Sequence, residues 1–164
     1  WTGAWGAPSE FLTDPFLKSG VEARVIHSLV HSSLAPKEPP SEKDWAGRRH
    51  LLQALESAHD AGVRIVGGSD AANPTVFPGY SMHHELELMV EAGLTPMEAL
   101  VASTRRAAEM LGREDEFGTI EAGKRADLLI LGSDPQVDIR NTQTLEVVIQ
   151  GGEIIDRSSL LSHE

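Results

Sequence analysis

A chain of 164 residues, 40% hydrophobic and 24% charged, can form one ordinary globular core, and its lack of cysteine excludes disulfides and thiolate sites. The net charge of −11 argues against a nucleic-acid partner, because such binding depends on Lys and Arg side chains that neutralise phosphates. The sequence has neither a signal peptide with a basic start nor an apolar run near the roughly 20 residues that cross a bilayer, so we expect no membrane partner and a cytoplasmic location.

The first predicted elements are two helices separated by a proline-rich stretch. Apolar residues at helical spacing predict a helix over Val21–Leu34, and Pro36–Pro40 ends it because proline lacks the backbone donor. Ser41 is a suitable N-cap for a second helix with acidic residues in its first turn. Its apolar pattern continues to Ala58, and we expect Gly62 to end it.

Residues 61–70 form the most informative stretch of the sequence. Val63–Val66 is a short β-branched run that predicts a buried strand, followed by Gly67, Gly68 and, at the strand end, Asp70. In α/β enzymes the carboxyl ends of strands open onto the active-site face. Asp70 is therefore the leading candidate for a catalytic or metal-binding carboxylate.

A long loop and a pair of helices are predicted next. The loop, Ser69–Ser81, is rich in proline and glycine, as binding loops often are. A helix is expected over Met82–Glu91. The sequence Thr95–Glu98 is a capping box with proline at the first helical position, which predicts another helix towards Leu111 with a break near Ser103.

The apolar periodicity changes after Gly118. Three strand-like runs follow, and Gly151–Gly152 joins the last two as a two-residue hairpin. These runs are Ala126–Leu131, Glu146–Gln150 and Glu153–Asp156. The pattern divides the chain into an α/β portion, residues 1–118, and a β segment, residues 119–164.

Four segments in order resemble the carboxy-terminal part of metal-dependent amidohydrolases. They are Gly62–Asp70, His83–Pro96, Gly118–Leu131 and Asp134–Asn141. The resemblance runs from about residue 40 to about residue 157 and is strongest to the branch with imidazolonepropionase-like and Xaa-Pro-dipeptidase-like enzymes. It implies an α/β fold: the last part of a (β/α)₈ TIM barrel, incomplete in this chain, followed by strands of a small composite β-sandwich.

The resemblance also implies a metal centre to which Asp70 contributes. In the family the equivalent carboxylate contacts a divalent metal and the hydrolytic water. The resemblance implies one or two metal ions, with Zn²⁺ as the favoured metal. The other ligands are a His-x-His pair, a bridging Lys or carboxylate and two further histidines, none of which has a counterpart here. We therefore expect a carboxy-terminal fragment that is inactive alone and need not hold a metal.

Other polar residues are weaker candidates. By the resemblance His83 occupies the His-x-Glu-Leu position after the active-site loop, where it either contacts substrate or bonds a loop carbonyl. Tyr80 either walls a substrate pocket or packs within its own loop. We expect His84 at the surface and Glu85 to serve the helix start. His27 and His31 share a helix face but lack the Glu of a zincin motif.

Three functions stay open from the sequence. The first is a parent enzyme that hydrolyses the C–N bond of an amide, cyclic amide or dipeptide, with Asp70 as metal ligand and proton shuttle. The second is a non-catalytic, self-associating fragment, since an opened barrel exposes strand edges. The third is a parent that acts as a lactonase or phosphotriesterase. A small-molecule or dipeptide substrate and a homo-oligomer are the expected partners.

Overall fold

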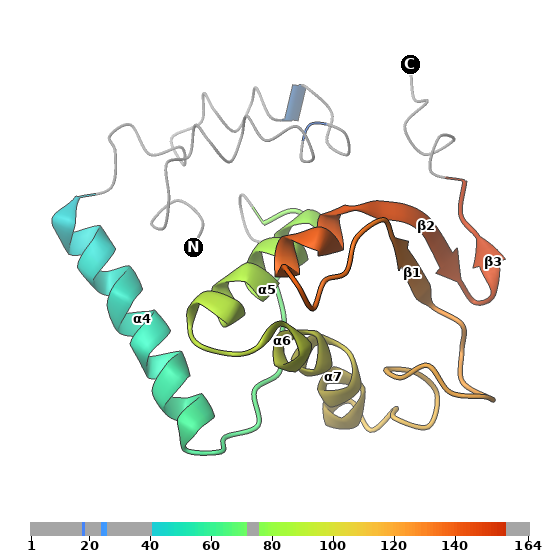
Figure 1. Ribbon diagram of the computed structural model, residues 1–164, viewed down its shortest axis with the longest axis horizontal. Coiled ribbons are helices and arrows are strands. Elements are labelled where there is room, and N and C mark those ends of the chain that lie inside the picture. Colours follow the sequence, from blue (N-terminus) through green and yellow to red (C-terminus); the bar gives the residue numbers. More distant parts are fainter. Residues whose placement is uncertain (1–17, 19–23, 26–40, 72–75, 157–164) are drawn as a thin grey trace.

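The computed structural model describes residues 18, 24–25, 41–71 and 76–156 (Figure 1). The helix predicted over residues 21–34, with its two histidines, therefore falls almost wholly outside the described residues.

Helix α4 (Glu42–Asp60) begins after the predicted N-cap Ser41 and ends just before Gly62. The Ser41 side chain accepts a hydrogen bond from the Asp44 backbone N–H, and the Asp44 carboxylate accepts the Ser41 backbone N–H at 2.8 Å, which completes a capping box. The helix ends at Ala61, and Gly62 follows with φ +76. None of its residues is fully buried, because α4 stands at the side of the molecule and packs mainly on α5 (Figure 1).

Three shorter helices form the centre of the molecule. Helix α5 (Tyr80–Glu91) begins two residues earlier than predicted, and α6 (Pro96–Ser103) starts at the predicted capping box of Thr95 and Glu98. The predicted break is present at Thr104 (φ −124, ψ −86), after which α7 (Arg105–Met110) continues in a new direction.

The hydrophobic core lies between α5, α6 and the 3₁₀-helix η2 (Ile139–Gln143). Its members are apolar side chains, and packing these elements together removes them from water. The buried residues are Leu86, Met89, Leu94, Ala99, Ala102 and Ile139. Leu55 of α4 and Ile65 of the connecting segment pack against this core.

The last described elements form an antiparallel sheet of order β1–β2–β3, in which the last two strands make the predicted hairpin. It consists of β1 (Leu128–Leu131), β2 (Leu145–Gln150) and β3 (Glu153–Ile154). The β2–β3 turn places Gly151 at φ 60 and Gly152 at φ 89, a conformation that favours glycine. The Asp127 carboxylate accepts the Gly151 backbone N–H at 2.8 Å and holds the turn against β1.

The prediction that Val63–Val66 forms a buried strand was wrong. The segment belongs to no sheet, and the Val63 side chain is 54% exposed. A strand needs a neighbour for its backbone hydrogen bonds. Among the described residues the only sheet is β1–β2–β3, at the other side of the helices (Figure 1). The complete barrel and the second layer of a β-sandwich stay predictions.

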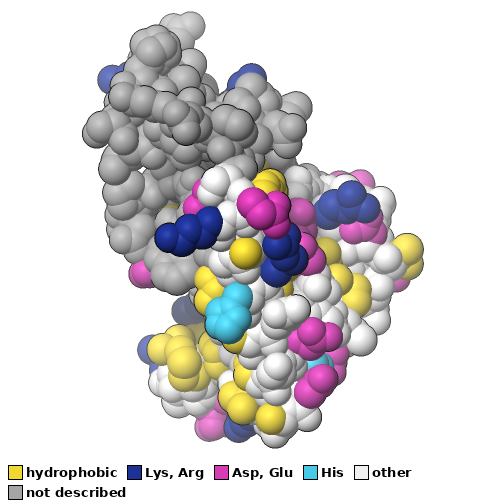
Figure 2. Space-filling model, turned by 90° about the vertical axis from the view of Figure 1, so that its left-hand side faces the viewer, with side chains coloured by type: hydrophobic (Ala, Val, Ile, Leu, Met, Phe, Trp, Pro, Cys, Tyr) yellow, Lys and Arg dark blue, Asp and Glu magenta, His cyan; other side chains and the backbone are white. Residues whose placement is uncertain are grey.

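No helix in the described part of the chain has the length and apolar character needed to cross a membrane. On the side where α4 lies, apolar side chains reach the surface among acidic and basic ones (Figure 2). Trp45 (38% exposed) and Leu51 (42% exposed) are the large apolar side chains of α4 that do so.

Candidate functional site

The segment 63–71 carries Asp70 and is held against α6 by a close backbone contact. The Gly67 backbone N–H donates to the Ala102 carbonyl oxygen at 3.2 Å. A Cβ atom on Gly67 would lie 2.1 Å from the Ser103 hydroxyl oxygen and 2.9 Å from the Met89 methyl group. Only glycine allows this approach, so residue 67 fixes where the following residues emerge from the helices.

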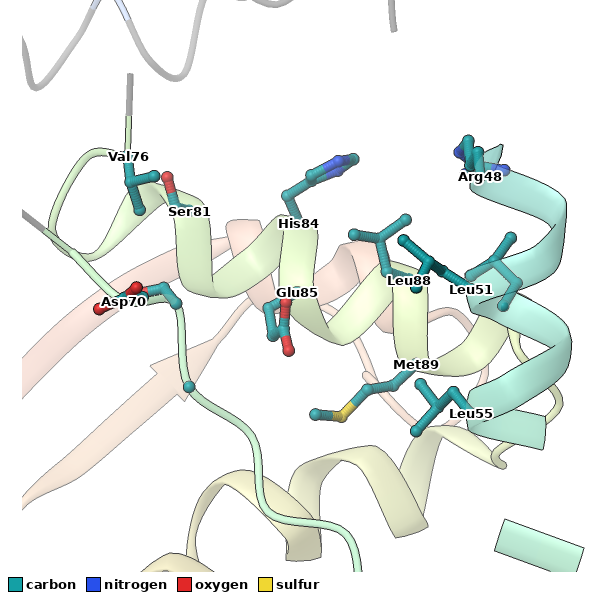
Figure 3. A pocket seen from close by; sticks show the side chains of 13 residues that line it. Arg48, Leu51, Leu55, Asp70, Val76, Ser81, His84, Glu85, Leu88 and Met89 are labelled. Atoms are coloured by element: carbon teal, nitrogen blue, oxygen red, sulfur yellow. The ribbon is translucent and has the colours of Figure 1, made fainter. Parts of the chain in front are cut away.

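Asp70 lies at the end of this segment and has an unusual backbone conformation. Its φ of +51 is the only positive value of a non-glycine residue in the described part of the chain. Aspartate tolerates this left-handed region better than most residues, but the conformation is still strained, and such strain is concentrated at functional sites. The Asp70 carboxylate is exposed and extends to the side of the segment opposite Glu85 (Figure 3).

A cavity of about 360 Å³ lies between α4, α5 and residues 68–70, and we call it the α4–α5 cavity (Figure 3). Its walls are mainly apolar, with a few polar groups at the end that contains Asp70. The lining residues are Arg48, Leu51, Leu52, Leu55, Gly68, Ser69, Asp70, Val76, Ser81, His84, Glu85, Leu88 and Met89. Mostly apolar cavities with few polar groups are the usual form of small-molecule sites.

Glu85 does not serve the helix start, contrary to the sequence expectation. Gly79 is the N-cap of α5 and makes no side-chain cap, while Glu85 lies one turn further on and lines the cavity. Its side chain points from α5 towards the segment that carries Asp70 (Figure 3). Burial raises the pKa of the Glu85 carboxyl above its usual 4.5. His84, expected at the surface, is half-buried and also lines the cavity.

His83 lies on another face of α5, towards η2. Its Nδ1 is 2.9 Å from the Thr142 hydroxyl oxygen, and that hydroxyl donates to the Ile139 carbonyl oxygen at 2.9 Å. The tautomer of His83 decides which of these two atoms donates. Burial lowers the pKa of His83, which favours the neutral ring. The contact ties α5 to η2.

Tyr80 is the first residue of α5, not part of the preceding loop. Like His83, it is absent from the residues that line the α4–α5 cavity. The structure therefore does not bring Tyr80 and His83 together with Asp70 around that cavity. Their roles in substrate binding stay predictions.

One edge of the α4–α5 cavity is closed by an ion pair between helices. The Arg48 guanidinium of α4 bonds both carboxylate oxygens of Glu91 on α5, a bidentate arrangement. This bond raises the pKa of Arg48 and lowers the pKa of Glu91. Arg48, which lines the cavity, is thus already paired with Glu91, which does not line it.

The metal ligands are incomplete. Among the described residues, no three His, Asp or Glu side chains gather where they could hold a metal ion. A catalytic zinc site uses three protein ligands and an open position. Asp70 is a single candidate ligand, so the described part of the chain does not fit a complete metal centre.

Residues 22–154 match the model of the amidohydrolase family, which covers most of the chain. The chain belongs to the amidohydrolase family. It is 38% identical over 122 residues to an N-substituted formamide deformylase from Arthrobacter pascens, covering 65% of this chain and 22% of that protein. It is 32% identical over 143 residues to an imidazolonepropionase from Haloarcula marismortui, covering 85% of this chain and 33% of that protein.

A solved structure of a Xaa-Pro dipeptidase with bound methionine in its active site resembles this amidohydrolase chain with a TM-score of 0.62 and 28% identity. The match covers 86% of this chain and 33% of that one. The chain thus spans about a third or less of the length of these relatives. The family resemblance inferred from the four sequence segments is confirmed.

Proposed function

We propose that this amidohydrolase chain forms part of a metal-dependent hydrolase of C–N bonds, with an amide, cyclic amide or dipeptide as substrate. The names of its relatives support this class of reaction: a deformylase of N-substituted formamides and a Xaa-Pro dipeptidase. The observation that carries the proposal is Asp70, a strained carboxylate at the end of a segment fixed against α6.

In this proposal the Asp70 carboxylate accepts a proton from the attacking water and returns it to the leaving nitrogen. Asp70 would also give one ligand to the metal, for which Zn²⁺ is the favoured ion. The other ligands would come from a part of the protein beyond the described residues. Asparagine at this position would keep the shape and lose the basic group.

The experiment is a comparison of two carboxylate variants of the protein expressed from its complete coding sequence and loaded with Zn²⁺. Asp70→Asn should lower kcat by about 10²–10⁴, the usual contribution of a general base. Asp115→Asn, an exposed carboxylate in the turn after α7, is the matched control and should keep full activity. Full turnover of N-formyl amines and Xaa-Pro dipeptides by Asp70→Asn would refute the mechanism.

The same assay separates the other bond classes. A lactone and a phosphotriester in the substrate panel test whether the parent acts on C–O or P–O bonds in place of C–N bonds. Preference for either of these substrates by at least tenfold in kcat/KM would replace the present proposal.

The absence of cysteine is compatible with a cytoplasmic enzyme.

A second candidate function, self-association, is favoured by the exposed apolar side chains of the β segment. Leu129 and Ile130 of β1 are 57% and 47% exposed, and Ile154 of β3 is 73% exposed. Exposed apolar groups on a sheet with open edges favour pairing with another copy. Light scattering on the 164-residue chain should give a homo-oligomer, and a monomer over the whole concentration range would contradict this candidate.

A further inference from the structure

The α4–α5 cavity combines an apolar wall with one half-buried carboxylate. The wall comes from leucines and a methionine on the facing sides of two helices, namely Leu51, Leu52, Leu55, Leu88 and Met89. Asp70 and Glu85 lie towards the opposite end from the α4 leucines (Figure 3). The volume of about 360 Å³ falls within the range of roughly 300–1,000 Å³ found for small-molecule sites.

The charge of Glu85 is not compensated within the described part of the chain, where it makes neither a hydrogen bond nor an ion pair. Its neighbours on α5 differ in this respect. Glu87 accepts a hydrogen bond from the Gln143 side chain at 3.0 Å, and Glu91 bonds Arg48. A half-buried carboxylate that faces a cavity without a partner costs free energy, and a cation in the cavity would offset that cost.

We propose that the α4–α5 cavity binds an apolar primary amine in its ammonium form. The ammonium group would donate hydrogen bonds to the Glu85 carboxylate, and the hydrocarbon chain would lie along the leucines of α4 and Leu88 of α5. An apolar carboxylic acid of the same size, bound in the same orientation, would place its carboxylate against that of Glu85, so we expect it to bind more weakly. Arg48 does not reverse the preference, since Glu91 already neutralises it.

An amine is also what hydrolysis of an amide or peptide bond releases. The α4–α5 cavity would therefore hold such a product beside the segment that carries Asp70. This last step rests on the proposed function, whereas amine binding itself does not, and the two are tested by different measurements. Binding to the cavity requires neither metal nor turnover.

The test is a titration of the 164-residue chain with hexylammonium chloride. Binding is monitored by calorimetry and by the amide NMR shifts of residues 84–89. We expect saturable binding, a weaker interaction with sodium hexanoate by at least tenfold, and shifts confined to the lining of the cavity. Across propyl-, butyl-, pentyl- and hexylammonium the affinity should rise roughly threefold to fourfold per methylene, because each buried CH₂ contributes about 0.8 kcal/mol.

Glu85→Gln and Glu87→Gln form a matched pair of variants on one helix. Glu85→Gln should weaken hexylammonium binding by about tenfold, the loss expected for one charge-assisted hydrogen bond, while Glu87→Gln should leave it within twofold. Circular dichroism of each variant shows whether α5 is still folded. Absence of saturable binding, equal affinity for hexanoate, or equal losses in two folded variants would overturn the proposal. Loss of hydrolysis in Asp70→Asn with amine binding intact would leave both proposals standing separately.

Discussion

Gly67 lies so close to Ser103 that a Cβ atom at position 67 would stand 2.1 Å from the Ser103 hydroxyl oxygen. That oxygen is buried and, in the described part of the chain, has no hydrogen-bond partner. Segment 63–71 thus contacts the end of α6 at Gly67, the first of its two adjacent glycines, and Asp70 follows three residues later. The pair connects the packing of the helices to the placement of the candidate catalytic carboxylate.

Gly67→Ala should destabilise the protein by about 1–3 kcal/mol, because the added methyl group overpacks the contact with Ser103 and Met89. Gly47→Ala is the matched control: Gly47 lies in α4, and a Cβ there meets nothing within 4 Å. In that exposed helical position alanine should stabilise by about 1 kcal/mol. Urea unfolding of the two variants gives the change in the free energy of unfolding for each. A change of the same sign in both variants would contradict the close contact at Gly67.

Ser103→Ala removes a buried hydroxyl that has no partner among the described residues, so its loss should be neutral or slightly stabilising. It should also reduce the penalty of Gly67→Ala, because the nearest clashing atom is then gone. Relief would be partial, since the Ser103 Cβ would still lie 3.1 Å from the new methyl group. A double-mutant cycle measures the coupling, and strict additivity of the two changes would contradict a direct contact.

Helix boundaries and the hairpin were predictable because their signals are local. Ser41 and Thr95 form capping boxes with carboxylates three residues later, and Gly151–Gly152 supplies the positive φ angles of a tight turn. Each of these features is complete within four consecutive residues. Neighbours in space add little to them, so sequence spacing alone identifies them correctly.

The strand at Val63–Val66 was mispredicted because pairing is not local. Its β-branched residues are typical of a strand, but a strand exists only where a second one supplies hydrogen bonds. Glu85 was missed for a related reason. Its position one turn into α5 indicates a helical carboxylate, and only the placement of α4 and of segment 63–71 shows that it lines a cavity.

Thr95→Ala should cost about 1 kcal/mol of unfolding free energy. The Thr95 hydroxyl accepts the Glu98 backbone N–H at 3.2 Å, and the Glu98 carboxylate accepts the Thr95 backbone N–H at 2.8 Å. The substitution removes the first bond and also the bond that the hydroxyl donates to the Glu98 carboxylate at 2.7 Å, and it leaves the second. The Glu98 backbone N–H then lacks its side-chain acceptor. Thr95→Ser retains the hydroxyl and should stay within about 0.5 kcal/mol of the natural protein, a comparison made by urea unfolding.

Glu85→Gln should stabilise the folded chain at neutral pH, and the gain should shrink on acidification. Burial raises the pKa of Glu85 in the folded state above the value of 4.5, so the folded carboxyl keeps its proton to higher pH than the unfolded one. Between these two pKa values the folded state binds more protons, and the free energy of unfolding falls as the pH rises. Glutamine does not titrate and avoids this loss.

The measurement is the melting temperature of Glu85→Gln relative to the natural protein between pH 4 and pH 8. Arg48, Asp70 and His84 also line the cavity and are present in both proteins, so the difference between the two proteins reports on position 85. Glu114→Gln, an exposed carboxylate beyond α7, removes the same charge without burial and should show no such pH-dependent gain. A gain for Glu85→Gln that is constant from pH 4 to pH 8 would contradict desolvation as its cause, because neutral glutamine and protonated glutamic acid are nearly equivalent at low pH.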